Sequence, residues 1–501
     1  MARATAPDKT WHYLPHLLAA GSVLRVAFAL ATSNVHCPDE MFQYLEQAHR
    51  VVYGYGVIPW DYRFGVRSWA LPGFVAGLLS LLRMLGLDQP AGYIPAIKIV
   101  FSLISLSLIA SVYYSARALI SESVARLAAM LATIWYELVY LAHKPSVDAL
   151  SVYAWFAALA VLVGRPTLIR QMAFGALTAL ALGIRIQNAP IVLVLLVFAL
   201  TRWPWRSALP AAATFVLVCA GFGALDLVTW GDWFGSYIRY FHFNWTVGAD
   251  NFFGRADVLY YMKPLVLCST GLALVGLRNL FYHTRHAWVL IAAPLVTLAV
   301  YSVPAHKEVR FIFAVIPFWL IGFAILDERL NTLRPGARAL APLRAGLTGL
   351  VASVSLAGAF GYLPLEKQVY PQAPASRAAP LDAYRLLSRT TDVSGIIDEA
   401  TPWWRGGGYF MLHKDVPIYY PEFFPAASFP DANPQPYVSH WMRPADAVSP
   451  GRDYELWHTV GEIAIWRRRN DPRTPGVLGG YTRDTIGPLD ALLTAQGMRH
   501  W

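Results

Sequence analysis

Long apolar runs separated by short polar loops dominate the first 365 residues. Runs of about 17 to 25 residues have the length that a helix needs to cross a bilayer. The pattern predicts a polytopic α-helical membrane protein with about eleven spans, near 15–32, 93–116, 126–142, 147–164, 172–184, 190–201, 207–225, 262–277, 287–303, 309–326 and 345–363. Arg25 falls inside the first span and is expected to face the helix bundle, since a charge facing lipid is costly.

Another apolar stretch, residues 69–87, is better placed along the membrane interface, because of the charges that follow it. If it does not cross, the basic loops all fall on one side, which the positive-inside rule makes cytoplasmic. Their basic residues are Arg3, Lys9, Arg117, Arg126, Arg165, Arg170, Arg202, Arg206, Arg278, Arg285, Arg329, Arg334, Arg338 and Arg344. If it crosses, the later loops change sides and no longer match the basic N-terminus. The first loop, with its juxtamembrane helices, and the C-terminal tail then face the exoplasm.

The chain changes character after about residue 365. Residues 366–501 are rich in Pro, Trp and Tyr, contain no run long enough to span, and include alternating stretches such as "DVPIYY" and "GEIAIWRRR". Alternation is typical of strands with one buried face. We therefore predict a transmembrane module over 1–365 and a small mixed α/β exoplasmic domain over 366–501.

Composition agrees with this class. Hydrophobic residues make up 56% of the chain and charged residues only 14%, against about 25% charged in soluble domains. The net charge of +10 comes from arginines in short loops, so orientation in a membrane explains it better than a nucleic-acid partner. Three cysteines give no disulfide framework, and the N-terminal apolar run lacks a small-residue cleavage site, so it is expected to be a retained span.

Asp39 and Glu40 stand side by side where the first span meets water. One interpretation is structural: Pro38 starts a helix, and acids suit its first turn. The other is catalytic: one carboxylate acts as a general base whose pKa is raised by partial desolvation. Gln43 and Glu46 follow at helical spacing and would orient that base or bind substrate hydroxyls.

A second cluster, "AHKEVRFIF", places His306, Lys307, Glu308 and Arg310 between two apolar runs. Cations at the ends of spans commonly anchor helices at the interface. Anchoring does not explain the acid Glu308, and three cations within five residues also suit an anionic headgroup. Arg67 and Arg185 are further exoplasmic cations in apolar surroundings.

Two loops offer weaker signals. Asp148 in "HKPSVD" is either part of a structural loop or a ligand contact, and one carboxylate is a poor metal site. The aromatic 226–261 loop, which contains Asn244, is either an interfacial aromatic belt or a surface on which sugars stack. The sequence has no glycine-rich phosphate loop and no metal-ligand spacing.

These motifs, in this order, resemble the glycosyltransferase family 22 mannosyltransferases of lipid-linked oligosaccharide and GPI-anchor assembly, which belong to the GT-C superfamily. The resemblance rests on "CPDEMFQYLEQAHRVVYGYGVIPWDYRFGVRSW" (37–69) and on "HKEVRFIFAVIPF" (306–318), with looser likeness in "AHKPSVDAL", "RIQNAP" and "FNWTVGADNFFG". It covers residues 15 to about 325 and weakens in the tail.

The resemblance implies the GT-C fold and an inverting transferase that moves mannose from a polyprenyl-phosphate donor to a lipid-linked or glycolipid acceptor, without a metal or other cofactor. By this likeness Asp39 or Glu40 is the base. His306, Lys307, Arg310, Arg185 and Arg67 bind the donor phosphate, and Gln43, Glu308, Asp148 and Asn244 contact substrate. The site would face the periplasm from a bacterial inner membrane, or the lumen if the source is a eukaryote.

Two departures leave specificity open. "HKPSVD" replaces the family's usual Arg-Thr-x-x-Asn pattern, and "RIQN" replaces an Arg-Pro-Thr type. The acceptor, and mannose against a sugar such as arabinose, are therefore undecided. A transporter or flippase of lipid-linked sugars is the alternative from another class, although such proteins place ionisable groups in the middle of several spans.

Overall fold

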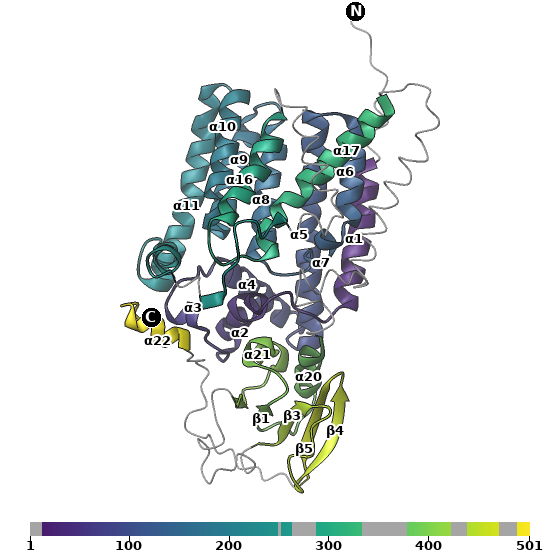
Figure 1. Cartoon of the computed structure of the whole chain (residues 1–501), viewed down its shortest axis with the longest axis vertical. Helices are drawn as coiled ribbons and strands as arrows, with labels where there is room; N and C mark the ends of the chain where they lie inside the picture. The colour runs from purple at the N-terminus through teal and green to yellow at the C-terminus, as the bar shows by residue number, and fades with distance from the viewer. Residues whose placement is uncertain (1–12, 249–251, 263–286, 333–377, 422–437, 470–487) are drawn as a thin grey trace, which may run out of the picture. The chain divides into compact units, whose positions relative to one another are not determined.

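A computed structural model describes residues 13–248, 252–262, 287–332, 378–421, 438–469 and 488–501 (Figure 1). The chain forms two compact units. The first contains Met1–Leu30, Lys98–Leu225 and Gly248–Pro371, and the second contains Ala31–Ile97, Asp226–Val247 and Gln372–Trp501. The predicted boundary between residues 365 and 366 lies outside the described residues.

Apolar helices build the first unit. They are α1 (Tyr13–Ala31), α5 (Pro90–Leu119), α6 (Glu122–Ile134), α7 (Tyr136–Tyr140), α8 (Val147–Leu162), α9 (Leu168–Ile184), α10 (Ala189–Arg202), α11 (Ala208–Trp230), α16 (Val289–Ser302) and α17 (Ile316–Thr332), with short 3-10 turns η3 (Ile186–Asn188), η4 (Trp205–Ser207) and η8 (Val309–Val315). Among the described residues, four helical stretches are long and apolar enough to cross a membrane: Tyr13–Ala31, Pro90–Leu119, Trp205–Trp230 and Val309–Arg329. The predicted spans 262–277 and 345–363 lie outside the described residues, so the count of eleven stays a prediction.

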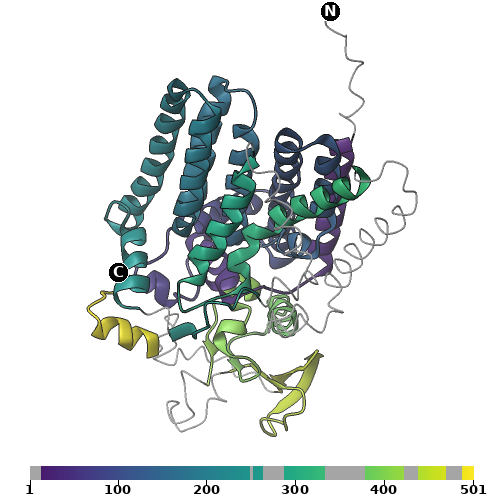
Figure 2. The ribbon, with the colours of Figure 1, turned by 45° about the horizontal axis from the view of Figure 1, so that its top comes forward.

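The helices of the first unit pack through aromatic side chains. Helices α8 and α9 lie side by side, as do α10 and α16 (Figures 1 and 2). Trp155 stacks on Phe318 at 5.4 Å between ring centroids, and Trp135 meets Trp319 edge to face at 4.6 Å. Such aromatic pairs stabilise a core beyond the area they bury.

The chain breaks its helix at Trp135, inside the span predicted over 126–142. Helix α6 ends at Ile134 and α7 begins at Tyr136, with extended backbone at Trp135 between them. A break frees carbonyl groups that would have accepted bonds within the helix. The Arg25 guanidinium, buried as expected, donates to the carbonyls of Ala132 and Thr133, each at 3.0 Å.

The first loop and part of the aromatic loop belong to the second unit. Their elements are η2 (Glu40–Leu45), α2 (Glu46–Tyr53), α3 (Trp60–Arg63), α4 (Ala70–Met84), α12 (Gly235–Phe241) and η5 (His242–Thr246). Helix α2 ends at Gly54, whose φ of 87° suits glycine. Helix α4 packs against α2 and η2 and exposes Phe74, Leu81 and Met84. An exposed apolar face is expected of a helix that lies in the membrane interface, and that location stays a prediction.

The tail forms a small mixed α/β fold, as the sequence predicts. Its elements are α20 (Ala378–Ser388), β1 (Ile396–Asp398), η11 (Trp403–Arg405), α21 (Gly408–Leu412), β2 (Ile418–Tyr419), β3 (His440–Pro444), β4 (Tyr454–Val460), β5 (Ile463–Arg468) and α22 (Pro488–Ala495). The sheet order is β2-β1-β3-β5-β4. Strand β1 is parallel to both neighbours, while β5 is antiparallel to β3 and β4.

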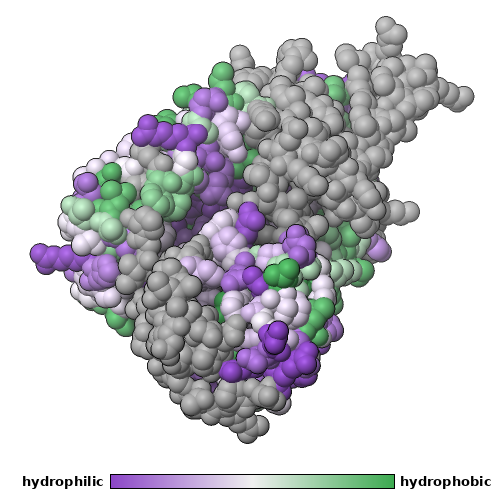
Figure 3. Space-filling model, turned by 60° about the horizontal axis from the view of Figure 1, so that its bottom comes forward, coloured by the Kyte–Doolittle hydropathy of each residue, from purple (hydrophilic) through white to green (hydrophobic). Residues whose placement is uncertain are grey.

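Within the sheet, strands β1 and β2 are buried at every position, while the outer hairpin of β4 and β5 presents polar groups. Ile397, Tyr419, Val438, Trp441 and Tyr454 form its buried apolar cluster. Strand β4 buries only Tyr454, and its other positions are half-buried or exposed. On the face of the molecule shown in Figure 3, hydrophilic side chains gather in several groups with hydrophobic ones beside them.

Candidate functional site

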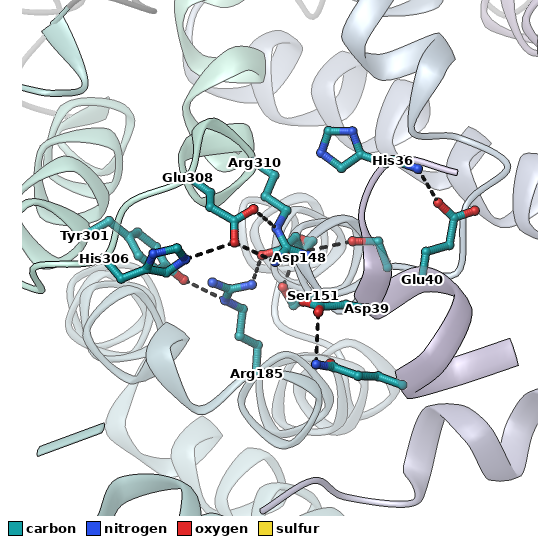
Figure 4. Close-up of polar contacts among 12 residues, drawn as sticks. His36, Asp39, Glu40, Asp148, Ser151, Arg185, Tyr301, His306, Glu308 and Arg310 are labelled. Carbon is teal, nitrogen blue, oxygen red and sulfur yellow. Dashed lines mark hydrogen bonds and ion pairs between the residues drawn. The ribbon is translucent and has the colours of Figure 1, made fainter. Parts of the chain in front are cut away.

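The two neighbouring acids of the first loop have different surroundings. Helix η2 begins at Glu40, so Asp39 directly precedes it. The Glu40 carboxylate is buried and accepts the backbone N–H of His36 at 2.8 Å (Figure 4). The Asp39 carboxylate is only partly buried and accepts the side-chain amide of Gln43 at 3.0 Å. Glu40 therefore stabilises the turn that starts the helix, while Asp39 remains partly exposed and is oriented by Gln43.

Arg67 belongs to the surroundings of these acids. Its Nε lies 3.3 Å from Oδ2 of the buried Asp61, and its guanidinium lies 5.1 Å from the ring centroid of Tyr240. Burial raises the pKa of Asp61 to about 6, with the charge of Arg67 opposing the rise and that of Asp39 adding to it. Arg67 therefore compensates negative charge within the second unit.

In the first unit, helix packing brings Asp148, Arg185 and Arg310 together. Asp148 occupies the first turn of α8, and its carboxylate pairs with Arg185 at the end of α9. Arg310 Nη1 lies 3.6 Å from the same carboxylate. All three side chains are nearly buried, and Figure 4 shows them lying close together. The Asp148 carboxylate thus balances two guanidinium groups, and its contact with a ligand stays a prediction.

Glu308 extends this charged cluster. Arg310 donates to it twice, from Nε and Nη2, each at 2.9 Å, and His306 Nε2 lies 3.1 Å from its Oε1. Burial opposes ionisation of Glu308, but Arg310 and His306 hold the pKa of this carboxyl well below its usual range. Glu308 is therefore the second carboxylate of the charged cluster, paired with Arg310 and His306, and its contact with substrate stays a prediction.

The side chains of Lys307 and Asn244 form hydrogen bonds with backbone carbonyl groups. Lys307 Nζ donates to the carbonyls of Pro304 at 2.6 Å and Ala256 at 3.0 Å. Asn244 Nδ2 donates to the carbonyl of Tyr240 at 2.8 Å. These bonds fix the local chain, and contact with substrate stays a prediction for both residues.

Tyr301 and Glu46 make contacts in the structure that the sequence did not indicate. Tyr301 accepts from Arg185 Nε at 2.9 Å and lies beneath its guanidinium, with 5.2 Å to the ring centroid. Glu46 was expected to orient the base or bind substrate. Its carboxylate instead accepts three backbone N–H groups, from Val57 at 2.8 Å, Tyr409 at 3.1 Å and Phe410 at 2.8 Å. A tyrosine hydroxyl and backbone amides leave no pattern in a single sequence.

Within the part of the chain that the structure describes, no three His, Cys, Asp or Glu side chains converge as metal ligands would. That the reaction needs neither a metal nor another cofactor stays a prediction.

The fold is that of a GT-C membrane protein. ArnT from Cupriavidus metallidurans bound to undecaprenyl phosphate has a similar structure, with a TM-score of 0.61 over 92% of this chain and 98% of that one, at 14% identity. The structure of the same protein in the apo state has a TM-score of 0.58, over the same 92% of this chain and 98% of that one. At this identity the likeness concerns the fold alone.

Sequence comparison then gives the family. The model of the Alg9-like mannosyltransferase family matches residues 17–385, and the chain belongs to this family. GPI mannosyltransferase 3 of Yarrowia lipolytica is 28% identical over 329 residues, which cover 60% of each chain. Its Trypanosoma brucei brucei counterpart is 28% identical over 377 residues, 62% of this chain and 65% of that one. GPI alpha-1,2-mannosyltransferase 3 of Mus musculus is 26% identical over 332 residues, 63% of this chain and 59% of that one. The match thus spans less than two thirds of each of these relatives.

Proposed function

We propose that this protein is an inverting glycosyltransferase that moves mannose from a polyprenyl-phosphate donor to a hydroxyl group of a lipid-linked or glycolipid acceptor. The reaction would take place at the exoplasmic face of a membrane. Membership of the mannosyltransferase family supports the class of reaction. The observation that carries the mechanism is the partly exposed Asp39 carboxylate, hydrogen-bonded to Gln43 beside a helix that also holds Glu40.

Asp39 is the proposed general base. It takes the proton of the acceptor hydroxyl while the hydroxyl oxygen forms a bond to the anomeric carbon of mannose. Glu40 is the weaker choice because its carboxylate accepts a backbone N–H of its own turn. Arg67, which interacts electrostatically with Asp39, supplies a cation in the surroundings of the proposed base.

The charged cluster of the first unit is the proposed site for the leaving phosphate. As the bond between the anomeric carbon and the phosphate oxygen breaks, that oxygen keeps the electron pair, and nearby cations stabilise its charge. Arg185 is best suited to this role. Its contacts to Tyr301 and Asp148 use Nε and Nη1, so Nη2 is the donor that remains for a phosphate oxygen.

Asp148 and Glu308 then have a supporting role. Two arginines close together repel each other, and carboxylates between them reduce the cost of burying both. The two hydrogen bonds from Arg310 to Glu308 form the bidentate arrangement that fixes a guanidinium in one orientation. We assign these two acids to positioning the arginines rather than to contact with the sugar.

The test uses the purified full-length chain with labelled polyprenyl-phosphate mannose and extracted lipids. A new mannolipid whose linkage has the anomeric configuration opposite to that of the donor supports the proposal. A retained configuration contradicts the inverting mechanism. Movement of lipid-linked sugar across vesicles without a new bond contradicts the enzyme and supports the transporter.

A further inference from the structure

The tail and the acid-bearing helix are joined within the second unit by a buried carboxylate. Glu46 directly follows η2 and accepts the backbone N–H groups of Tyr409 and Phe410 at the start of α21. Gly408 has a φ of 56°, and a Cβ there would lie 2.7 Å from Glu46 Oε2. Only glycine gives the carboxylate this approach without strain.

A second contact joins the same two segments beside this carboxylate. The rings of Phe42, in η2, and Trp403, in η11, meet edge to face at 5.1 Å. Trp403 is partly exposed, so one part of its indole packs on Phe42 and another remains accessible. Phe42 is three residues after Asp39 in the chain, and the tail therefore contacts the helical segment that follows the proposed base.

The turn that carries Trp403 is rigidly held. Asp398 Oδ1 accepts the N–H groups of Ala400 and Thr401, each at 3.1 Å. Its Oδ2 accepts the hydroxyls of Tyr384 and Thr401, each at 2.9 Å. A Cβ on Gly407 would lie 2.8 Å from Tyr384 Cβ, so the turn packs closely on α20. In the "WWRGGG" sequence, the three glycines are thus buried, and the three large side chains before them are partly exposed.

The turn also offers a second aromatic ring and a cation. Arg405 Cζ lies 4.7 Å from the ring centroid of Trp404, and both side chains are partly exposed. In the described part of the chain, Arg405 Nε is buried without a hydrogen-bond partner. Two indoles beside a fixed guanidinium combine an apolar platform with a donor of hydrogen bonds.

We propose that Trp403, Trp404 and Arg405 form the subsite that binds the saccharide of the acceptor. A pyranose ring presents an apolar C–H face that stacks on an indole, while its hydroxyl groups take hydrogen bonds from the guanidinium. The turn stands beside the helix whose acid would deprotonate the acceptor hydroxyl, which is where the acceptor sugar must lie. This inference rests on the proposed function.

The position of the turn in the sequence points to specificity. The family model matches residues 17–385, so residues 403–405 lie beyond the part that the family has in common. The proposed base is inside the matched part. The proposed reaction would then be common to the family, while the acceptor subsite would be particular to this chain.

The experiment measures transfer by the full-length protein in nanodiscs, from labelled polyprenyl-phosphate mannose to octyl α-mannoside, octyl β-glucoside and octyl β-N-acetylglucosaminide. Trp403→Ala and Trp404→Ala should each raise the KM for the preferred glycoside about tenfold, in line with the loss of one aromatic contact. The KM for the donor should change less than about twofold. Trp403→Phe, which keeps a ring, should recover most of the loss, and Trp457→Ala on β4 is the matched control for a partly exposed tail tryptophan.

Each result decides the matter. Unchanged glycoside KM in both alanine variants, with an active wild-type protein, overturns the subsite and leaves the proposed function standing. An equal rise in donor and glycoside KM, or an equal effect of Trp457→Ala, also overturns it, because the tryptophans would then act on the fold in general. A wild-type protein that transfers mannose neither to a glycoside nor to extracted lipids contradicts the proposed function itself.

Discussion

The Arg310 guanidinium lies 3.6 Å from the carboxylate of Asp148, which also pairs with Arg185. Asp148 is thus a buried acid that faces two buried cations from distant parts of the chain, of which Arg310 is also paired with Glu308. Removing one partner of a buried pair costs more than the pair contributes, because the remaining charge stays buried and unpaired. This relationship gives the charged cluster a stability that depends on Asp148.

Asp148→Ala should destabilise the protein by about 3–5 kcal/mol, the range for breaking a buried ion pair. Thermal unfolding in detergent measures this as a large fall in Tm. The control is Glu399→Ala, which removes a more exposed pair with Arg443 and should cost less than about 1 kcal/mol. Equal effects of the two variants would contradict the buried cluster.

Asp39→Asn should lower kcat by about 10²- to 10⁴-fold, the usual contribution of a general base. Glu40→Gln should lower it less than about tenfold, because the amide oxygen of glutamine still accepts the N–H of His36. Both are measured with labelled donor at saturation, and thermal unfolding checks that each variant is folded. The opposite ranking would transfer the role of base to Glu40.

Arg185→Gln should raise the KM for the polyprenyl-phosphate donor by about tenfold to a hundredfold, since a charge-assisted bond to phosphate contributes roughly 1.5–3 kcal/mol. The KM for the acceptor should change little. Arg239→Gln, which removes the partly exposed pair with Asp232, is the control. An increase confined to the acceptor KM would contradict the phosphate assignment.

Glu46 should make stability depend on pH. Burial raises the pKa of Glu46 from 4.5 to about 7, although backbone N–H groups and Arg50 oppose the rise. The folded protein therefore binds this proton more tightly than the unfolded chain, and the stability present below pH 4.5 is lost as the pH rises to about 7. The Tm of the wild-type protein should fall between pH 5 and pH 8, and Glu46→Gln should reduce this fall. Glu462→Gln, at an exposed position, should leave the wild-type slope intact.

Arg25→Met should lower the free energy of unfolding by weakening the helix break at Trp135, and it should leave substrate binding unchanged. It leaves the carbonyls of Ala132 and Thr133 without their donor, at about 1–3 kcal/mol for each unsatisfied group. Arg126→Met removes a more exposed pair with Glu122 and should cost less than about 1 kcal/mol. A Tm unchanged by Arg25→Met would show that other groups satisfy the break.

Local patterns in the sequence predicted much of the fold. Apolar runs located α1, α5 and α11 because a long uninterrupted apolar helix has few alternatives to a membrane. The alternating stretches "DVPIYY" and "GEIAIWRRR" correspond to β2 and β5. The break at Trp135 was missed because nothing nearby in the sequence, such as a proline, marks it. Its stabilising donor, Arg25, comes from another helix.

The candidate site divides in the same way. The sequence alone determined which ionisable residues stand next to apolar runs, where burial is costly and each charge needs a reason: Asp39, Glu40, Asp148, Arg185, Glu308 and Arg310 were all found in this way. Only the tertiary structure decided their partners. Asp148 meets Arg310, and Glu46 meets the backbone of Phe410, because packing brings together groups that chain order keeps far apart, and a charge is neutralised by its neighbours in space.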